Sequence, residues 1–195
     1  MNTDQINKIL SRNRITKNAY LGCFPSDKIP EVQNFMFPQC MCINTANSSS
    51  IGEHWVGIWV QSPEHMELYD SLAQWPPHSP GIMAFVSKFP KKNIKYLPPG
   101  MNFQHLHSNA CGAHVCHFLY RRSSGFSFEQ IIDFLLAILL KGRGYKIRIL
   151  KSSCSSLANF HNPKLIRRIT LNSAQGREAV DCYVKEFIRK CIFKN

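Results

Sequence analysis

The chain has few acidic residues and no long hydrophobic run. It carries 12 aspartates and glutamates against 24 lysines and arginines in 195 residues. The longest apolar run, residues 131–140, is interrupted by Asp133 and falls short of the ~20 apolar residues that a membrane-spanning helix needs. The first ten residues contain no basic segment followed by a sustained apolar stretch, so they do not read as a secretory signal. The sequence therefore predicts a soluble protein without a leader.

No internal repeat and no linker between domains interrupts the sequence. A chain of 195 residues that is 44% hydrophobic is long and apolar enough for one globular domain with a substantial core. We expect a single domain over residues 1–195. Because the chain lacks a recognisable leader, its eight cysteines are expected to be reduced thiols and not a disulfide framework.

The excess of positive charge is the main compositional signal. The formal net charge is +12, and an excess of this size favours a polyanionic partner, which we expect to be nucleic acid bound without sequence specificity. The alternative is a basic surface that serves solubility alone. The cations that carry this expectation include Lys91, Lys92, Lys95, Arg121, Arg122, Lys141, Arg143, Lys146, Arg148, Lys151, Lys164, Arg167 and Arg168.

Hydrophobic periodicity predicts alternating short helices and strands. The pattern favours strands over residues 40–46, 54–61, 66–70 and 93–97, and helices over 4–10, 82–89, 111–121, 128–140 and 178–191. We expect Thr3 to cap the first helix and Ser127 the fourth. The first three strands are expected to be neighbours, and residues beyond Gly142 are basic and less periodic. Together these elements predict an α+β fold in which helices flank a mixed or antiparallel sheet.

The stretch QHLHSNACGAHVCHFLYRR contains a cysteine placed to act as a nucleophile. Cys111 falls at the start of a predicted helix, where unpaired backbone N–H groups and the helix dipole lower the pKa of a thiol. His54, at the start of a strand and followed by Trp55, can serve as the base, and Asp70 at the end of the next strand can orient the imidazole. Gln104 can supply an oxyanion donor beside the backbone N–H of Cys111.

Two explanations from other classes compete with a cysteine nucleophile. A zinc module could be built from His105 or His107 with Cys111, His114 and Cys116, but this spacing matches no common zinc pattern and leaves His54 and Asp70 without a role. A basic nucleic-acid-binding module without enzymatic activity would account for the charge alone. Taken singly, each candidate residue has an ordinary structural explanation. We assign no function to His105, His107, His114, Cys116 and His117.

The order and spacing of these residues resemble a known family. The segments NTANSSSIGEHWVGIWV, LYD and QHLHSNACGAHVCHFL resemble the adenovirus endopeptidase (adenain) family and its relatives among the deSUMOylating cysteine peptidases. The shared pattern is His-Trp, an acidic residue that ends a following strand, then Gln, six residues and Cys-Gly. AYLGCFPSDKIP is similar to the adenain opening, and FLYRRSSGFSFEQII is similar to the adenain-like proteases of Maverick/Polinton virus-like DNA elements. The resemblance covers roughly residues 18–135 and does not extend over the C-terminal third.

The resemblance implies a papain-like, adenain-like fold and the activity of a thiol protease. Cys111 would be the nucleophile, His54 the base, Asp70 its orienting acid and Gln104 the oxyanion donor, with Trp55 narrowing the substrate channel. Cleavage would follow glycine in virion or element-encoded precursor proteins, and the alternative is a deconjugase that acts on ubiquitin-like tails. The protease would be an intracellular monomer in the host nucleus or the virion, and its chemistry requires no metal or cofactor.

The resemblance also implies DNA as an activator and shows two departures from the family. Lys91, Lys92 and Lys95 before the Gln104 loop, and Arg121 and Arg122 after the Cys111 helix, would contact the DNA. Asp70 stands where adenain has a glutamate. Asn93 stands where adenain has the cysteine that joins its activating peptide, so the resemblance does not carry that disulfide over to this chain.

Overall fold

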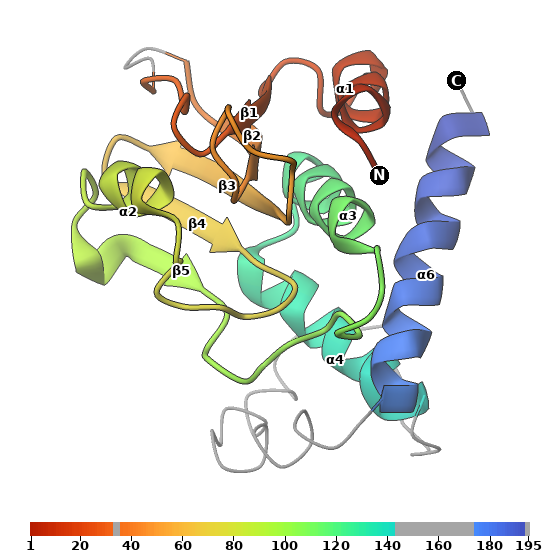
Figure 1. The fold of residues 1–195 in the computed structure, drawn as a ribbon. Coiled ribbons are helices and arrows are strands. Elements are labelled where there is room, and N and C mark those ends of the chain that lie inside the picture. The colour runs from red at the N-terminus through yellow and green to blue at the C-terminus, as the bar shows by residue number, and fades with distance from the viewer. Residues whose placement is uncertain (33–35, 143–173, 194–195) are drawn as a thin grey trace.

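The computed structural model describes residues 1–32, 36–142 and 174–193, and its centre is a five-stranded mixed sheet (Figure 1). The strand order is β1-β2-β3-β4-β5, with parallel outer pairs β1·β2 and β4·β5 and an antiparallel centre. The bounds are β1 Tyr20–Pro25, β2 Gln39–Asn44, β3 Trp55–Ser62, β4 His65–Tyr69 and β5 Ile94–Tyr96. The predicted α+β class is confirmed, as is the adjacency of β2, β3 and β4.

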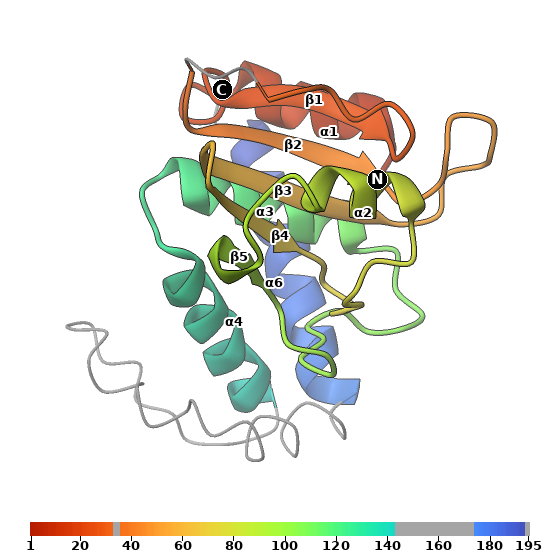
Figure 2. The ribbon, with the colours of Figure 1, turned by 90° about the vertical axis from the view of Figure 1, so that its left-hand side faces the viewer.

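Helices cover both faces of this sheet. They are α1 Thr3–Arg12, α2 Pro80–Val86, α3 Cys111–Ser123, α4 Phe128–Gly142 and α6 Ala174–Phe193, with a short 3₁₀ helix, η1, at Lys91–Asn93. Helix α2 lies on one face, whereas α1 and α3 lie on the other and α6 packs outside α3 and α4 (Figures 1 and 2). Among the described residues, no helix is long and apolar enough to cross a membrane.

The strands divide their side chains between two separate apolar cores. In β2, Cys40 and Cys42 face the core shared with α3, α4 and α6, while Met41 and Ile43 face the core under α2. This period-2 alternation is the pattern of a strand that is covered on both faces. The burial of all six residues of β2 follows from it.

A glycine sets how closely α3 approaches the sheet. A Cβ atom added at Gly57 in β3 would lie 3.2 Å from Val115 Cγ1 and 3.3 Å from Phe118 Cδ1, both on α3. The missing side chain therefore lets the helix pack directly on the backbone of β3. This close contact brings the start of α3 beside the start of β3.

Several predicted boundaries needed correction. The cap of α1 is Asn2, whose Oδ1 accepts from Gln5 N at 2.9 Å while Gln5 Oε1 accepts from Asn2 N at 3.1 Å, and Thr3 is already helical, so the predicted Thr3 cap is wrong. Ser127 is a cap as predicted, because its Oγ accepts from Gln130 N at 3.2 Å. Strand β1 was not predicted, and the basic stretch 143–173 lies outside the described residues.

Candidate active site

The candidate site lies where the start of β3, the end of β4 and the start of α3 meet. In the antiparallel pair, Gly57 of β3 is opposite Tyr69 of β4. His54, just before β3, and Asp70, just after β4, therefore lie at the same end of the sheet. Cys111 is the first residue of α3 and takes part in the same cluster. The structure thus brings together three residues that the sequence places up to 57 positions apart.

His54 and Asp70 form a close ion pair at the base of the site. His54 Nε2 lies 2.7 Å from Asp70 Oδ1, and the two side chains are 12% and 6% exposed. The carboxylate also accepts from the backbone N–H groups of Leu72, at 2.9 Å to Oδ1, and Gln74, at 3.0 Å to Oδ2. Asp70 is therefore held by its own turn, and it fixes the imidazole so that the other ring nitrogen is available to a nucleophile.

Cys111 and His54 shift each other's protonation. Burial opposes ionisation of Cys111, but its hydrogen bond with His54 and the backbone N–H groups of Trp55 and Gly112 lower the pKa of the thiol below its usual value. Burial likewise opposes the charge of His54, yet hydrogen bonds with Asp70 and Cys111 raise its pKa to about 9. The two shifts favour a thiolate beside an imidazolium, which is the reactive state of a cysteine nucleophile.

Gln104 lies in the wall of the same cleft with its amide held on both sides. Its Oε1 accepts from Ser71 Oγ at 2.6 Å, and its Nε2 donates to Ser108 O at 2.8 Å. The contact with Ser108 uses one of the two Nε2 hydrogens, so the other can serve an oxyanion. Ser71 follows Asp70 directly and is fully buried. One dipeptide therefore positions both the imidazole and the amide.

The cleft has a volume of ≈ 610 Å³. Its lining includes residues that the sequence did not point to, among them Asn44 and Leu72. Trp55 lines it, and its Nε1 donates to Met1 O at 3.1 Å, which joins the start of the chain to the wall. The lining residues are Met1, Asn2, Thr3, Asn44, Gly52, Glu53, His54, Trp55, Leu72, Gln104, Leu106, Ser108, Asn109 and Cys111. The four predicted catalytic residues contribute to this cleft or, for Asp70, support His54 behind it.

A second buried histidine–aspartate pair ties α6 to the site. His114 Nε2 of α3 lies 2.7 Å from Asp181 Oδ1 of α6, and Tyr69 OH lies 3.2 Å from His114 Nδ1. Asp181 Oδ2 also accepts from the backbone N–H of His105 at 3.2 Å. Tyr69 precedes Asp70 and His105 follows Gln104, so this network supports the neighbours of two site residues. Burial lowers the pKa of His114 although Asp181 opposes the shift.

The alternative zinc cluster is not assembled. Cys111 is paired with His54, His114 is paired with Asp181, and Cys116 is buried in the core. Within residues 1–32, 36–142 and 174–193, no three His, Cys, Asp or Glu side chains are grouped so that they could hold a metal ion. The proposed ligands serve separate contacts instead.

The two arginines of the expected DNA-binding set are engaged inside the protein. Arg121 Nη2 donates to Tyr183 OH at 3.0 Å, and its guanidinium lies between 5.1 and 5.5 Å from the ring centres of Phe126, Phe134 and Phe187. Arg122 Nε lies 2.7 Å from Glu67 Oε2, with side chains 10% and 7% exposed. These contacts join α3 to α4, α6 and β4, so both guanidinium groups have partners within the protein, although the two residues are only half-buried.

The three lysines of that set lie on η1 and β5, and none of them lines the cleft. Lys91 and Lys92 are exposed on η1, and Lys95 Nζ lies 2.8 Å from Glu129 Oε1. In the parallel pair β4·β5, Ile94 is opposite Met66 and Tyr96 is opposite Leu68. Strand β5 thus begins beside the start of β4, whereas Asp70 follows the end of β4. The structure therefore does not bring these lysines to the candidate site.

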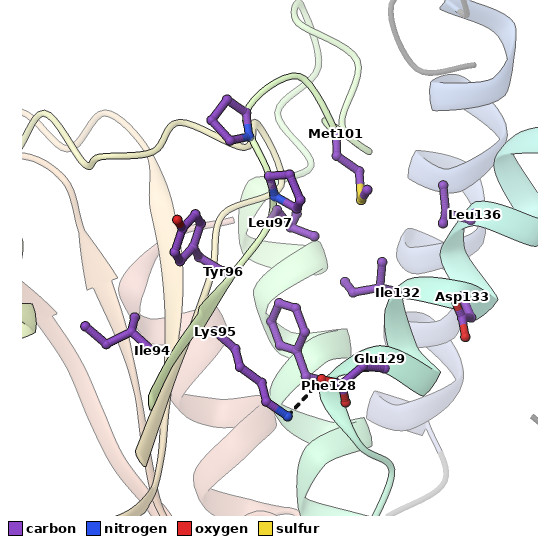
Figure 3. Close-up of a pocket in the computed structure, with 12 residues that line it drawn as sticks. Ile94, Lys95, Tyr96, Leu97, Met101, Phe128, Glu129, Ile132, Asp133 and Leu136 are labelled. Atoms are coloured by element: carbon purple, nitrogen blue, oxygen red, sulfur yellow. Dashed lines mark ion pairs between the residues drawn. The ribbon is translucent and has the colours of Figure 1, made fainter. Parts of the chain in front are cut away.

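A second cavity lies between β5 and α4, and its lining is mostly apolar (Figure 3). It has a volume of ≈ 390 Å³, and Leu97, Met101 and Ile132 lie around it with the Lys95–Glu129 ion pair at one side. Asp133 also lines it. The described residues that line it include no cysteine and no histidine, so they offer no second thiol–imidazole pair.

Comparisons with known proteins add little. No protein-family model and no curated protein matches the chain. Among solved structures, a similar one is the central domain of the uncharacterized Lpg1148 protein from Legionella pneumophila, with a TM-score of 0.39 and 12% identity over 98% of this chain and 97% of that chain. At this TM-score the likeness supports no argument about function.

The shifted pKa values of Cys111 and His54 predict selective alkylation. A group with a lowered pKa keeps its charge until the pH falls through that value, so Cys111 should react with iodoacetamide well below pH 9 and ahead of the other thiols. His54→Ala removes the hydrogen bond and the cation while burial remains, so the pKa rises. Each unit of that rise lowers the thiolate fraction at neutral pH about tenfold. Mass spectrometry of the labelled peptides across a pH series measures this rate, and uniform labelling of all eight cysteines would contradict the assignment.

The contact between Ser71 and Gln104 predicts coupled effects on turnover. Gln104→Ala should lower kcat by roughly 10²- to 10³-fold, which is the usual cost of losing one oxyanion donor. Ser71→Ala releases the amide and should lower kcat less, while alkylation of Cys111 is unchanged. In the Gln104→Ala background, Ser71→Ala should have no further effect on kcat, because the amide that it positions is gone. Additive losses in this double-mutant cycle would show that Ser71 affects kcat independently of the Gln104 amide.

Proposed function

We propose that the protein is a cysteine endopeptidase with the papain-like arrangement of the adenain class. The observation that carries this proposal is the convergence of Cys111, His54 and Gln104 on one cleft, with Asp70 hydrogen-bonded behind His54. A nucleophile, its base, an orienting acid and an oxyanion donor are the four parts that acyl transfer needs. The resemblance in sequence supports the same residues in the same roles.

The chemistry follows from the positions of these groups. The Cys111 thiolate attacks the scissile carbonyl carbon, and the negative oxygen that develops is met by the Cys111 backbone N–H and Gln104 Nε2. The His54 imidazolium gives its proton to the leaving amine, which leaves an acyl-enzyme. His54 then takes a proton from the attacking water, and Cys111 leaves as the thiolate. Asp70 stabilises the imidazolium through both steps.

The substrate class comes from the resemblance and agrees with the cleft lining. The resemblance implies cleavage after glycine, and Trp55, whose indole is held by its hydrogen bond to Met1 O, would narrow the channel at that point. We propose virion or element-encoded precursor proteins as substrates, in the host nucleus or the virion. A ubiquitin-like tail that ends in Gly-Gly would satisfy the same narrow channel, so the two substrate classes need a direct comparison.

Peptidase assays test this function. The purified chain should cleave peptides that contain glycine, and Cys111→Ala should abolish cleavage because Cys111 is, among the described residues, the thiol that is paired with His54. Asp70→Asn should lower kcat with little change in KM, because Asp70 acts through His54 and not on substrate. Cys182→Ala, at an exposed cysteine on α6, is the matched control and should keep full activity.

The choice of substrates makes the outcome decisive. Faster cleavage of internal glycine sites than of a ubiquitin-like fusion supports the endopeptidase, and the reverse order supports the deconjugase. Equal turnover by wild type and Cys111→Ala would overturn both. Chelators should leave activity unchanged, because none of the proposed steps uses a metal ion.

We also propose that the protein binds DNA without sequence specificity through Lys91, Lys92 and Lys95. Log K for short duplexes should then fall linearly with log salt, with a slope of about −0.9 per phosphate contacted. Replacing the three lysines with alanine should reduce that slope and leave Cys111 alkylation intact. The matched control is Lys17→Ala with Lys28→Ala, which removes two other exposed lysines near β1. An equal reduction of the slope in both variants would show that the three lysines form no particular DNA site, and the positive charge would then be explained by solubility alone.

Catalytic stimulation by DNA is a separate measurement on the same samples. Titration of duplexes into the peptidase assay gives kcat/KM with and without bound DNA. None of the three lysines lines the cleft, because they lie on η1 and β5. Stimulation therefore requires coupling through the sheet and not direct contact of DNA with the cleft. Tight binding with an unchanged kcat/KM would show that DNA binds the protein without activating it.

A further inference from the structure

Two thiols outside the cleft face each other across the outer parallel strand pair. Cys23 of β1 is paired in register with Cys42 of β2. Paired residues of neighbouring strands lie about 4.8 Å apart and point to the same face of a sheet, which is inside the range of about 4.4–6.8 Å between the Cα atoms of disulfide-bonded cysteines. Both side chains belong to the core under α3, where Cys23 is partly buried and Cys42 is fully buried. The register therefore places the two thiols within the range of a disulfide.

The surroundings of the two thiols make them chemically unequal. Tyr20 OH lies 3.1 Å from Cys23 Sγ and donates to Asn7 Oδ1 at 2.9 Å. The hydrogen bond with Cys42 lowers the pKa of Cys23 although burial opposes it. Burial raises the pKa of Cys42 well above its usual value. Cys23 is therefore the accessible thiol of the pair that ionises first, and Cys42 is protected from reagents in solution.

Cys40, Cys116 and Cys182 do not combine partial exposure, a facing thiol and contact with a hydroxyl group. Cys40 shares the inner face of β2 with Cys42 but is paired in register with Tyr20, and burial raises its pKa to about 12. Cys116 lies on α3 and is fully buried. Cys182 is exposed on α6, and this helix stands apart from β1 and β2 (Figure 1). Cys23 and Cys42 are thus set apart from the other described thiols by a partly exposed member, a facing partner and a hydroxyl contact.

We propose that Cys23 and Cys42 are a reversible redox pair that peroxide converts to a disulfide. The Cys23 thiolate attacks one oxygen of hydrogen peroxide, the O–O bond breaks, and Cys23 sulfenic acid and hydroxide form. Cys42 sulfur then attacks the Cys23 sulfur, its proton leaves with the displaced hydroxyl group as water, and the S–S bond closes. Two electrons pass from the two thiols to peroxide, and a dithiol reductant reverses the reaction.

The disulfide would link β1, an edge strand, to β2. Helix α1 would be held with it, because Tyr20 OH donates to Asn7 of that helix and Cys23 Sγ lies 4.0 Å from Thr3 O. Cross-linking constrains the unfolded chain, so the oxidised protein should unfold at a higher temperature than the reduced protein. This role is independent of the peptidase proposal, since neither thiol lines the cleft.

Peptide mapping after mild oxidation tests the pair. The full chain carrying Cys111→Ser, which removes the competing reactive thiol, is treated with hydrogen peroxide, alkylated and digested with trypsin. The expected product is peptide 18–28, which contains Cys23, linked to peptide 29–88, which contains Cys40 and Cys42. Dithiothreitol should release the two peptides. Absence of the link, with Cys23 oxidised directly to sulfinic acid, would overturn the proposal.

Variants at the neighbouring positions identify the partner. Cys40→Ala should keep the link between peptides 18–28 and 29–88, whereas Cys42→Ala should abolish it and let Cys23 sulfenic acid accumulate, where dimedone traps it. A link that survives Cys42→Ala would contradict the pairing. Cys23→Ser places a side chain of similar size at this partly exposed position. In that variant Cys42 should stay unoxidised. Oxidation of Cys42 at the wild-type rate in Cys23→Ser would also overturn the proposal.

Discussion

The antiparallel register between β3 and β4 is the constraint on which the site depends. Gly57 opposite Tyr69 places His54 and Asp70 at one end of the hairpin, and a 2.7 Å ion pair results. A slip of one residue would turn each side chain of one strand to the other face. The two separate cores resist that slip, because Met66 and Leu68 are buried under α2 while Tyr69 is buried under α3. The geometry of the His54–Asp70 pair is therefore fixed by apolar packing and not by the ion pair itself.

The approach of α3 to β3 adds Cys111 to this pair. Gly57 leaves room for Val115 and Phe118, and α3 then starts beside the N–H of Trp55, which bonds to Cys111. Helix α6 supports the arrangement from outside through Asp181, which contacts His114 and the backbone of His105. Since His105 follows Gln104, the support reaches the proposed oxyanion loop. The C-terminal helix is thus part of the framework of the site, although the sequence resemblance does not extend to it.

Short-range signals were enough to predict most elements and to single out the four candidate residues that the structure groups together, but not the residues that support them. Alternating β-branched and aromatic residues marked β3, and Ser127 marked the start of α4, because such signals depend on neighbours within a few positions. Strand β1 escaped prediction because Gly22, with φ of 137°, breaks its alternation. Asp181 was missed, and the ion pair of Arg122 was not foreseen when that residue was assigned to DNA binding, for another reason. Their partners His114 and Glu67 lie 67 and 55 positions away, and a single sequence carries no local sign of such pairs.

The position of the exposed lysines limits how charge can act on the site. Lys91 and Lys92 precede β5, and β4 separates them from Asp70. Five residues of strand span about 17 Å, whereas a charge in solution is screened over about 8 Å at physiological ionic strength. The field of these lysines is therefore weak at the thiolate, and the shifted pKa values of Cys111 and His54 arise from contacts within the site. A polyanion bound at η1 would have to move β4 or β5 to change the chemistry, because direct electrostatics do not reach that far.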